Sequence, residues 1–372
     1  MANVTVVGTP AGPVSLPFTN AEQAVIAQQL ATAINAGVAA GTLAPKQAAG
    51  IGAPTLPAGT SGELVIQKGG LEVLSPGYVA VVADASGITL LGDGQTNQSV
   101  LAGTGGLTYI TNGGSGTIVA GGGDNRIVTS GVGWNVSTGG GNDTLVASSG
   151  AVTLSAGGGQ NAIQLGSGTA LVDTTGRDQI QGGTGAATVN VQLGAHAFYT
   201  GGAGTLLFID TGAGSTVVGG SGAETIFGAN GSYTGGTSGN NLIYGSGTLT
   251  GGGGGDTLSA TGQQATLLQA AAGNETLSAA LSTGADTLVA GPGADTLFGG
   301  AGKDVFEFNA ATGGGSILVQ DFTAADSVHL GGYIGNPVTS VSGGAAGTTL
   351  QLSDKTTITF AGVTDPTKLH FS

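Results

Sequence analysis

The chain has 372 residues, of which 77 are glycine, and its formal net charge is −14 although only 8% of its residues are charged. Glycine does not recur at every third position, which excludes a collagen triple helix, and a hydrophobic content of 40% excludes a disordered tail. Seven lysines and arginines cannot neutralise many phosphates, so nucleic acid is not expected as a partner. With no cysteine there is no disulfide and no thiolate zinc site, and the acidic excess suits a hard cation.

Residues 1–60 lack the glycine-rich turns of the rest of the chain and predict a short strand at 4–7 and one helix. The helix is expected to begin at a cap formed by Thr19 or Asn20 and to end near Ala40. Its apolar face is predicted to consist of residues at spacing four, namely Ile26, Leu30, Ile34 and Val38. Two roles stay open for this segment: it caps the open end of its own chain, or it docks on another subunit.

The N-terminus has neither a basic region nor a long apolar run, so a standard cleaved secretory signal is not expected. No stretch approaches the ~20 consecutive apolar residues of a membrane helix, so no membrane span is expected.

Apolar residues recur every nine positions over much of residues 61–307, with a few slips. A short strand buries one such residue, and two strands with two turns make a coil of eighteen residues. We therefore predict an all-β fold, a parallel β-roll or β-helix solenoid. The residues predicted to point inward are Tyr109, Ile118, Ile127, Val136, Leu145, Leu154, Ile163, Val172, Ile180, Val189, Phe198, Leu207, Leu249, Leu258, Leu267, Leu288, Leu297 and Phe306.

Triple-glycine turns lie eighteen residues apart in the middle of the chain, at 120–128, 138–146 and 156–164. They are predicted to stack along one edge of the solenoid, with blander turns along the opposite edge. Their ends carry amides and carboxylates, in the pairs Asp124-Asn125, Asn142-Asp143 and Gln160-Asn161. Stacked Asn and Gln side chains can form hydrogen-bond ladders, so this part need not bind a metal at every level.

Residues 308–372 lose the glycine pattern and alternate between apolar and polar residues at 316–320 and 356–360. This alternation predicts ordinary strands that form a C-terminal β cap, which a solenoid needs to blunt its exposed edge.

The candidate chemistry is the pattern G-x-D-x-apolar, which occurs in TGGGNDTLV, GGGGGDTLS, LSTGADTLV, AGPGADTLF and GGAGKDVFE, with GGSGAETIF as a glutamate version. Glycines let backbone carbonyls turn toward a cation, and a carboxylate adds a hard oxygen ligand of the kind that calcium prefers. The candidate Ca²⁺ ligands are Asp143, Asp256, Glu275, Asp286, Asp295 and Asp304, with the glycines Gly284, Gly293 and Gly302; Asp178 is a weaker candidate.

Asp286 and Asp304 lie eighteen residues apart and are expected on one edge, with Asp295 on the other. At the ~4.8 Å spacing of neighbouring strands, two stacked carboxylates repel by roughly 3 kcal/mol at an effective dielectric constant of about 20. A cation between them would remove this repulsion. The alternative is that these carboxylates turn outward into water.

The segment GGAGKDVFEFN followed by ILVQDFTAADSVHL resembles the end of a roll in the RTX (repeat-in-toxin) family, and the terminal TTITFAGVTDPTKLHFS is similar to the final strands of such proteins. The resemblance is specific over 281–372, diluted over 90–280 and absent over 1–60. It implies calcium binding, export by type I secretion through an uncleaved C-terminal signal, and a location outside a bacterial cell or on its surface.

No catalytic set is recognisable, so we expect no enzyme. The protease pattern H-E-x-x-H and the lipase pattern G-x-S-x-G are missing, and His196, His329 and His370 are isolated in the sequence. A lyase or epimerase site on a β-helix would need clustered acids and bases. The chain is expected to be an extracellular structural protein that assembles with itself into a surface layer, fibre or biofilm matrix. The alternative is a secreted adhesin or glycan-binding module, with cell-surface or matrix polysaccharide as partner and Trp134 as a candidate stacking platform.

Overall fold

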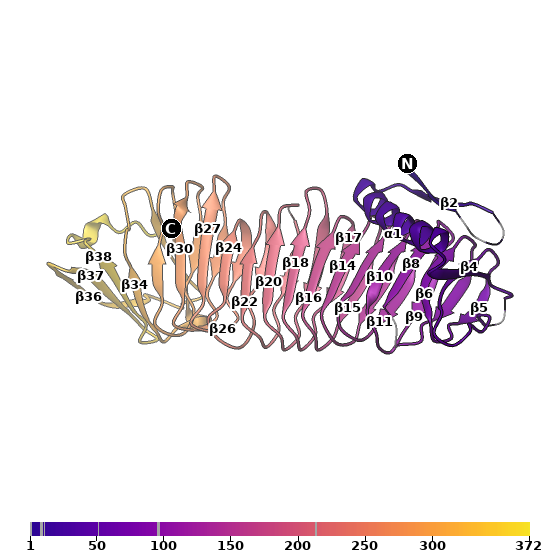
Figure 1. Cartoon of the computed structure of the whole chain (residues 1–372). Coiled ribbons are helices and arrows are strands. Elements are labelled where there is room, and N and C mark those ends of the chain that lie inside the picture. The colour runs from indigo at the N-terminus through magenta and orange to yellow at the C-terminus, as the bar shows by residue number, and fades with distance from the viewer. Residues whose placement is uncertain (1, 8–9, 11, 51, 95–96, 213) are drawn as a thin grey trace. The chain divides into compact units, whose positions relative to one another are not determined.

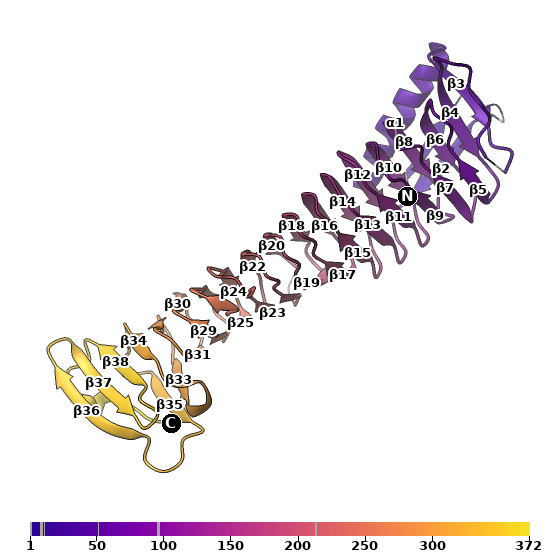
Figure 2. The ribbon, with the colours of Figure 1, turned by 90° about the horizontal axis from the view of Figure 1, so that it is seen from below.

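The computed structural model describes residues 2–7, 10, 12–50, 52–94, 97–212 and 214–372, which form two compact units, Met1–Ala197 (unit 1) and Phe198–Ser372 (unit 2). In both units short strands pair in parallel with strands one coil away, so each unit is an all-β parallel solenoid (Figures 1 and 2). In unit 1, for example, Ile118 pairs with Val136, one full coil of eighteen residues later. The predicted fold class is therefore confirmed.

Each coil contributes one strand to a front sheet and one to a back sheet. In unit 1 the front sheet contains β3 (Leu43–Gln47), β4 (Ser61–Ile66), β6 (Tyr78–Ala83), β8 (Gln98–Ala102), β10 (Gly116–Ala120), β12 (Trp134–Thr138), β14 (Val152–Ala156), β16 (Ala170–Thr174) and β18 (Ala187–Val191). Its back sheet contains β5 (Gly70–Val73), β7 (Ile88–Leu91), β9 (Leu107–Ile110), β11 (Arg126–Thr129), β13 (Thr144–Ala147), β15 (Ala162–Leu165) and β17 (Arg177–Gln181).

Unit 2 repeats this plan. Its front sheet contains β20 (Leu206–Asp210), β22 (Glu224–Phe227), β24 (Leu242–Gly245), β27 (Thr257–Gly262), β30 (Thr276–Ser282), β32 (Thr296–Phe298) and β34 (Ser316–Val319). Its back sheet contains β21 (Thr216–Val218), β23 (Gly231–Thr234), β25 (Gly247–Thr250), β28 (Leu267–Gln269), β31 (Thr287–Val289), β33 (Val305–Asn309) and β35 (Ser327–Gly331), and β19 (His196–Thr200) spans the boundary between the units. A further short pair, β26 (Gly253–Gly254) and β29 (Ala272–Gly273), lies within turns.

The core is a narrow column of Val, Ile, Leu and aromatic side chains between the two sheets. Most of the predicted inward residues are buried, including Ile127, Leu145 and Ile163. Three were wrong by one position: the buried residues are Tyr199, Phe208 and Leu268, whereas Phe198, Leu207 and Leu267 point outward or sit at the surface. Turns that are one residue longer than the rest shift the count, and in a strand a shift of one residue reverses the face.

Helix α1 (Ala21–Ala39) is capped as predicted, because the Asn20 Oδ1 accepts the backbone N–H groups of Glu22 and Gln23 at 2.8 and 3.2 Å. It does not cover the open end of the solenoid. It lies along the outer face of the front sheet of unit 1, together with the antiparallel pair β1 (Ala2–Val6) and β2 (Val14–Phe18) (Figure 1). The apolar sheet residues in this contact are Val65, Ala80, Val82, Leu101 and Val119.

The predicted apolar face of α1 was correct for Ile34, which is buried, but wrong in detail elsewhere. Its most buried apolar positions are mainly alanines, Ala24, Ala27 and Ala31, while Ile26 and Leu30 are half-buried at the flanks. Small side chains let the helix approach the sheet closely.

The front sheet is blunted at its first strand in unit 1 and after its last parallel strand in unit 2. The first front strand, β3, contains Pro45, which has no N–H to donate, and Lys46, and both residues disfavour pairing with a further strand. In unit 2, β34 pairs in parallel with β38 (Thr357–Ala361), which continues antiparallel into β37 (Gly347–Leu352) and β36 (Val338–Gly344). The predicted C-terminal strands are thus present. One-turn 3₁₀ helices lie at Ala310–Thr312 and Pro366–Lys368.

Within the described part of the chain, no helix combines the length and the apolar composition that a bilayer crossing needs.

Candidate calcium-binding turns

Turns that lead from a front strand to a back strand (front-to-back turns) carry a column of alternating amides and carboxylates in unit 1. Asp143 Oδ1 accepts both the backbone N–H and the side-chain N–H of Asn125, at 2.8 and 2.9 Å. Asn161 Oδ1 accepts the N–H of Asp143 at 2.9 Å. Asp178 Oδ1 then accepts both N–H groups of Asn161, at 2.9 and 2.8 Å. All four residues are buried, so the expected ladder exists and runs inside the turns.

A second, solvent-exposed ladder runs beside it. Asp124 Oδ1 accepts the N–H of Asn142 at 2.8 Å, and Asn142 Oδ1 accepts the N–H of Gln160 at 2.9 Å. In the buried ladder an amide separates the carboxylates, and the exposed ladder contains a single carboxylate, so no two carboxylates are direct neighbours within a ladder. Unit 1 therefore has a way to stack these turns without a cation at each level.

The corresponding column in unit 2 contains consecutive carboxylates. Asp286 Oδ1 accepts the N–H of Thr266 at 2.7 Å, and Asp304 Oδ1 accepts the N–H of Asp286 at 2.8 Å. Asp326 Oδ1 accepts the N–H of Asp304 at 3.0 Å. Asp286 and Asp304 are thus neighbours on one edge, as predicted from their spacing. Asp326 was missed because it follows no glycine turn; its only sequence signal is the Asp-x-Val pattern of DSV.

Two oxygens in this column are buried without a hydrogen-bond partner: Oδ2 of Asp286 and Oδ2 of Asp304. Burial raises the pKa of Asp304 to about 6; the hydrogen bond from Asp286 opposes this rise, while the negative charges of Asp326, Asp286 and Asp321 add to it. Buried carboxylate oxygens that lack a donor are costly unless a positive charge accompanies them. The column is therefore short of positive charge at this point.

The turns that lead from a back strand to a front strand (back-to-front turns) carry a second acidic column in unit 2. Asn241 Oδ1 accepts the N–H of Glu224 at 3.0 Å, and Asp256 Oδ1 accepts the N–H of Asn241 at 2.7 Å. Further along, Asp295 Oδ1 accepts the N–H of Glu275 at 3.0 Å. Asp295 therefore lies on the edge opposite Asp286 and Asp304, as expected.

Within this second column, Glu275 is the residue whose carboxylate lacks hydrogen-bond donors. Both of its carboxylate oxygens are buried without a partner, and burial together with the neighbouring charge of Asp295 raises its pKa to about 8. The remaining oxygens of its neighbours are already used: Asp256 Oδ2 accepts the N–H of Gly252 at 2.7 Å and Asp295 Oδ2 that of Gly291 at 2.9 Å. Asp143 in unit 1 also keeps one buried unpartnered oxygen, Oδ2.

The three candidate glycines lie where successive turns approach each other closely. A Cβ on Gly302 would overlap the carbonyl oxygen of Gly284, and one on Gly293, whose φ is +145°, would overlap that of Gly273. A Cβ on Gly284 would clash with the carbonyl oxygen of Gln264. Backbone carbonyl oxygens are therefore packed along the same two edges as the acidic columns.

This arrangement fits calcium better than a transition metal. In the described residues no group of three or more His, Cys, Asp or Glu side chains is placed to hold a metal ion, so a cation would take most of its ligands from backbone carbonyls. Calcium accepts six to eight oxygen ligands, including carbonyls, in flexible geometry. The residues that fit such a site best are Asp286, Asp304 and Glu275. Asp256 and Asp295 fit it less well, because backbone N–H groups occupy their oxygens.

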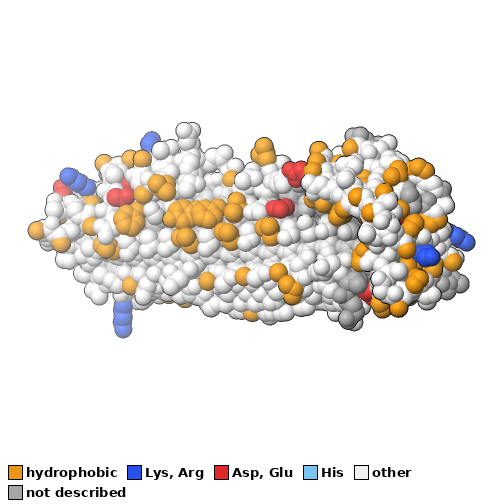
Figure 3. Space-filling model, in the orientation of Figure 1, with side chains coloured by type: hydrophobic (Ala, Val, Ile, Leu, Met, Phe, Trp, Pro, Cys, Tyr) orange, Lys and Arg blue, Asp and Glu red, His pale blue; other side chains and the backbone are white. Residues whose placement is uncertain are grey.

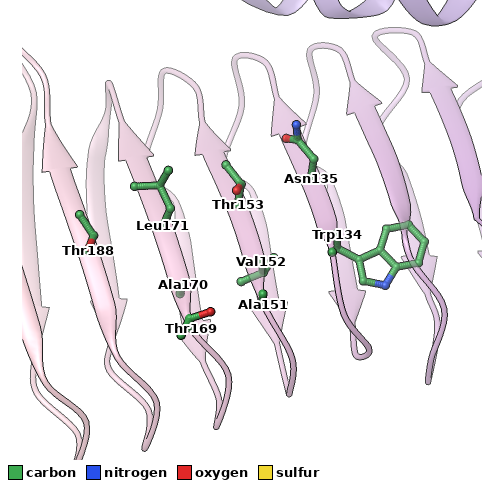
Figure 4. Close-up of a pocket in the computed structure, with 10 residues that line it drawn as sticks. Trp134, Asn135, Ala151, Val152, Thr153, Thr169, Ala170, Leu171 and Thr188 are labelled. Carbon is green, nitrogen blue, oxygen red and sulfur yellow. The ribbon is translucent and has the colours of Figure 1, made fainter.

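The prediction that Trp134 is an exposed stacking platform for sugar is wrong. Trp134 is 2% exposed, its Nε1 donates to the carbonyl of Ser130 at 3.0 Å, and its ring centroid lies 5.7 Å from that of Tyr109. It lines the base of a groove of about 490 Å³, but the side chains that face outward there are Asn135, Thr153, Leu171 and Thr188 (Figure 4). Trp134 therefore presents no open face to a ligand.

A comparison with models of known protein families finds a calcium-binding repeat at the acidic turns. The model of the RTX calcium-binding nonapeptide repeat matches residues 137–169 and 282–310, in four copies. The first segment contains Asp143, and the second contains Asp286, Asp295 and Asp304. Searches of curated proteins and of solved structures find no match.

Proposed function

We propose, from the premise that this is a chain of the RTX family, whose nonapeptide repeats bind Ca²⁺, that it is an extracellular structural protein. Calcium binding stabilises its folded state, and the folded chain assembles with itself. One observation carries the proposal: in unit 2, the carboxylates of Asp286, Asp304 and Glu275 are buried next to other carboxylates and keep unpartnered oxygens. Unit 2 is then the calcium-dependent part of the chain. Unit 1, with its amide-separated ladders, is the part that folds without the ion.

In the proposed sites, Asp286 and Asp304 hold calcium at the front-to-back turns and Glu275 at the back-to-front turns, with carbonyls of the turns around Gly284, Gly293 and Gly302 as further ligands. Asp143, Asp256 and Asp295 are secondary candidates. Bound calcium supplies the positive charge that the columns lack. Because the turns come together only in the folded chain, the free energy of binding adds to the free energy of folding.

Such coupling suits a chain that is exported unfolded from a calcium-poor compartment and folds outside, and RTX repeats are typical of secreted bacterial proteins. A structural role is supported by the architecture of the two units, since almost all of their residues belong to the coils of the solenoid or to the segments that cover it. Low charge density also supports self-association, since subunits repel each other little. The blunted strand β3 and the C-terminal β cap favour contact through the sides of the units over pairing of strands at their ends.

Calcium titration of the full chain tests this proposal. We expect calcium to raise the protection of unit 2 against hydrogen exchange and to produce large particles in light scattering at high protein concentration. The double variant Asp286→Ala/Asp304→Ala should lose both effects, while Asp124→Ala, in the exposed ladder of unit 1, should keep them. A wild-type chain that binds no calcium excludes the proposal, and one that binds calcium but stays monomeric excludes its assembly part.

A further inference from the structure

The outer face of the front sheet in unit 2 has a groove of about 340 Å³ that the calcium sites do not use. Tyr244 on β24 and Phe298 on β32 form its two ends, and Leu281 on β30 overhangs it with 64% of its surface exposed. The groove lies in the region where hydrophobic side chains gather on this face in Figure 3. Outside it, the exposed ring of Phe227 stacks on Tyr244, with centroids 5.7 Å apart and planes at 15°.

The register of the strands sets the geometry of this groove. Tyr244 pairs with Ser259, Ser259 with Ser278, and Ser278 with Phe298. The two aromatic rings are thus three strand spacings apart, or roughly 14 Å. A second row of hydroxyls, from Thr257 and Thr276, runs parallel to the serines.

An irregularity in strand pairing places Leu281 over the groove. The register between β27 and β30 shifts between Ser259 and Thr261, and both strands extend beyond their neighbours. Such a bulge re-aims the side chains that follow it, which here brings Ala280 and Leu281 to the rim of the groove.

The chemistry of the lining selects the kind of ligand. None of the eight lining residues is charged, four are serines or threonines whose hydroxyls can donate and accept hydrogen bonds, and aromatic rings close both ends. A pyranose ring has apolar C–H faces, which suit aromatic rings, and a rim of hydroxyls, which suit a hydroxyl floor. An anionic ligand would find no cation here among the lining residues.

A protein occupant fits less well. Where protein does cover this kind of face, under α1 in unit 1, the sheet contributes a cluster of apolar Val, Leu and Ala side chains. The unit 2 groove has a floor of serine and threonine instead. A second copy packed on it would bury these hydroxyls, which costs free energy unless each finds a partner.

We propose that the groove between Tyr244 and Phe298 binds an extended, uncharged chain of pyranose sugars, such as the neutral polysaccharide of a cell surface or matrix. This inference goes beyond the calcium role proposed above and depends on it only in that unit 2 must be folded. Such a groove would attach the folded, calcium-bound protein to a polysaccharide.

The test is isothermal titration calorimetry on the full chain in saturating calcium, with cellohexaose and β-1,4-mannohexaose as probes. We expect at least one of them to bind. Tyr244→Ala and Phe298→Ala should each weaken binding by about tenfold, the order of magnitude for losing one aromatic stacking contact. Tyr244→Phe keeps the ring and should bind like the wild type. Phe198→Ala is the matched control, because Phe198 is an exposed aromatic residue on the back-sheet strand β19.

Circular dichroism and calcium titration on the same samples separate the two proposals. If neither oligosaccharide binds to a folded, calcium-loaded chain, or if both alanine variants bind like the wild type, the glycan site is wrong and the calcium role stands. Loss of self-association in Tyr244→Ala without any effect on sugar binding would also overturn the proposal, since the face would then be a contact between copies.

Discussion

Replacing Asp304 by Asn is expected to change the stability of unit 2 in opposite directions with and without calcium. The side chain lies between Asp286, whose N–H it accepts at 2.8 Å, and Asp326, to which its own N–H donates at 3.0 Å. At the ~4.8 Å strand spacing, each neighbouring carboxylate repels it by roughly 3 kcal/mol at an effective dielectric constant of about 20, and the hydrogen bond offsets part of this. The rise of its pKa from 3.8 to about 6 corresponds to about 3 kcal/mol at neutral pH.

In chelator, Asp304→Asn should therefore stabilise unit 2 by about 2–3 kcal/mol at pH 7, because an amide there reproduces the position of Asn161 in unit 1. In saturating calcium the same variant should be less stable than the wild type, because a charged ligand is lost. The pKa of Asp304 is raised on folding, so its ionisation destabilises the folded state above about pH 6 and has no effect below about pH 4. The advantage of the amide in chelator should accordingly fade as the pH falls through this window.

The assay is urea unfolding followed by hydrogen exchange of peptides that cover β31 and β33, with and without calcium. Asp354→Asn is a control of opposite sign: Asp354 accepts the N–H of Thr356 at 2.9 Å and the hydroxyl of Tyr333 at 2.8 Å, and its pKa is lowered. That variant should destabilise unit 2 whether or not calcium is present. Equal destabilisation by Asp304→Asn in chelator and in calcium would refute the reasoning that the column lacks positive charge.

Three further outcomes are expected. Asn161→Asp, which places three carboxylates in a row in the ladder of unit 1, should lower the stability of unit 1 in chelator by about 3 kcal/mol or more, and calcium should restore part of it; thermal unfolding by Trp fluorescence measures this. Glu63 is fully buried on the outer face of β4, both of its oxygens lack partners, and burial raises its pKa from 4.5 to about 7. Its ionisation therefore destabilises unit 1 as the pH rises from about 4.5 to 7, and Glu63→Gln should flatten the decline of melting temperature over that range. Gly293→Ala should abolish cooperative folding of unit 2 because its Cβ has no room, whereas Gly140→Ala, with open space around the new Cβ, should melt close to the wild type; circular dichroism compares them.

The sequence predicts the solenoid because burial of one apolar residue per strand imposes a period, and glycine marks the turns between strands. It fails where two apolar residues are adjacent. Phe198 and Tyr199, or Leu267 and Leu268, satisfy the pattern equally well, and only the length of the preceding turn decides which one points inward. Turn length depends on packing between coils, which the pattern of a single coil does not contain.

The candidate site shows the same limit. The edge on which each aspartate lies follows from counting by eighteen, and this worked for Asp286, Asp295 and Asp304. Whether an oxygen is free for a cation does not follow from the count. Asp295 and Glu275 are neighbours on one edge, yet turn N–H groups occupy the oxygens of the first and leave those of the second without partners. That difference depends on the path of the backbone through each turn.

The most direct test of the central claim is hydrogen exchange of the full chain, measured once in calcium and once in chelator. We predict that peptides from β27 to β35 exchange much faster in chelator than in calcium, while peptides from β9 to β17 keep the same protection in both. Protection that does not change with calcium in unit 2, or that is lost equally in both units, would contradict the account.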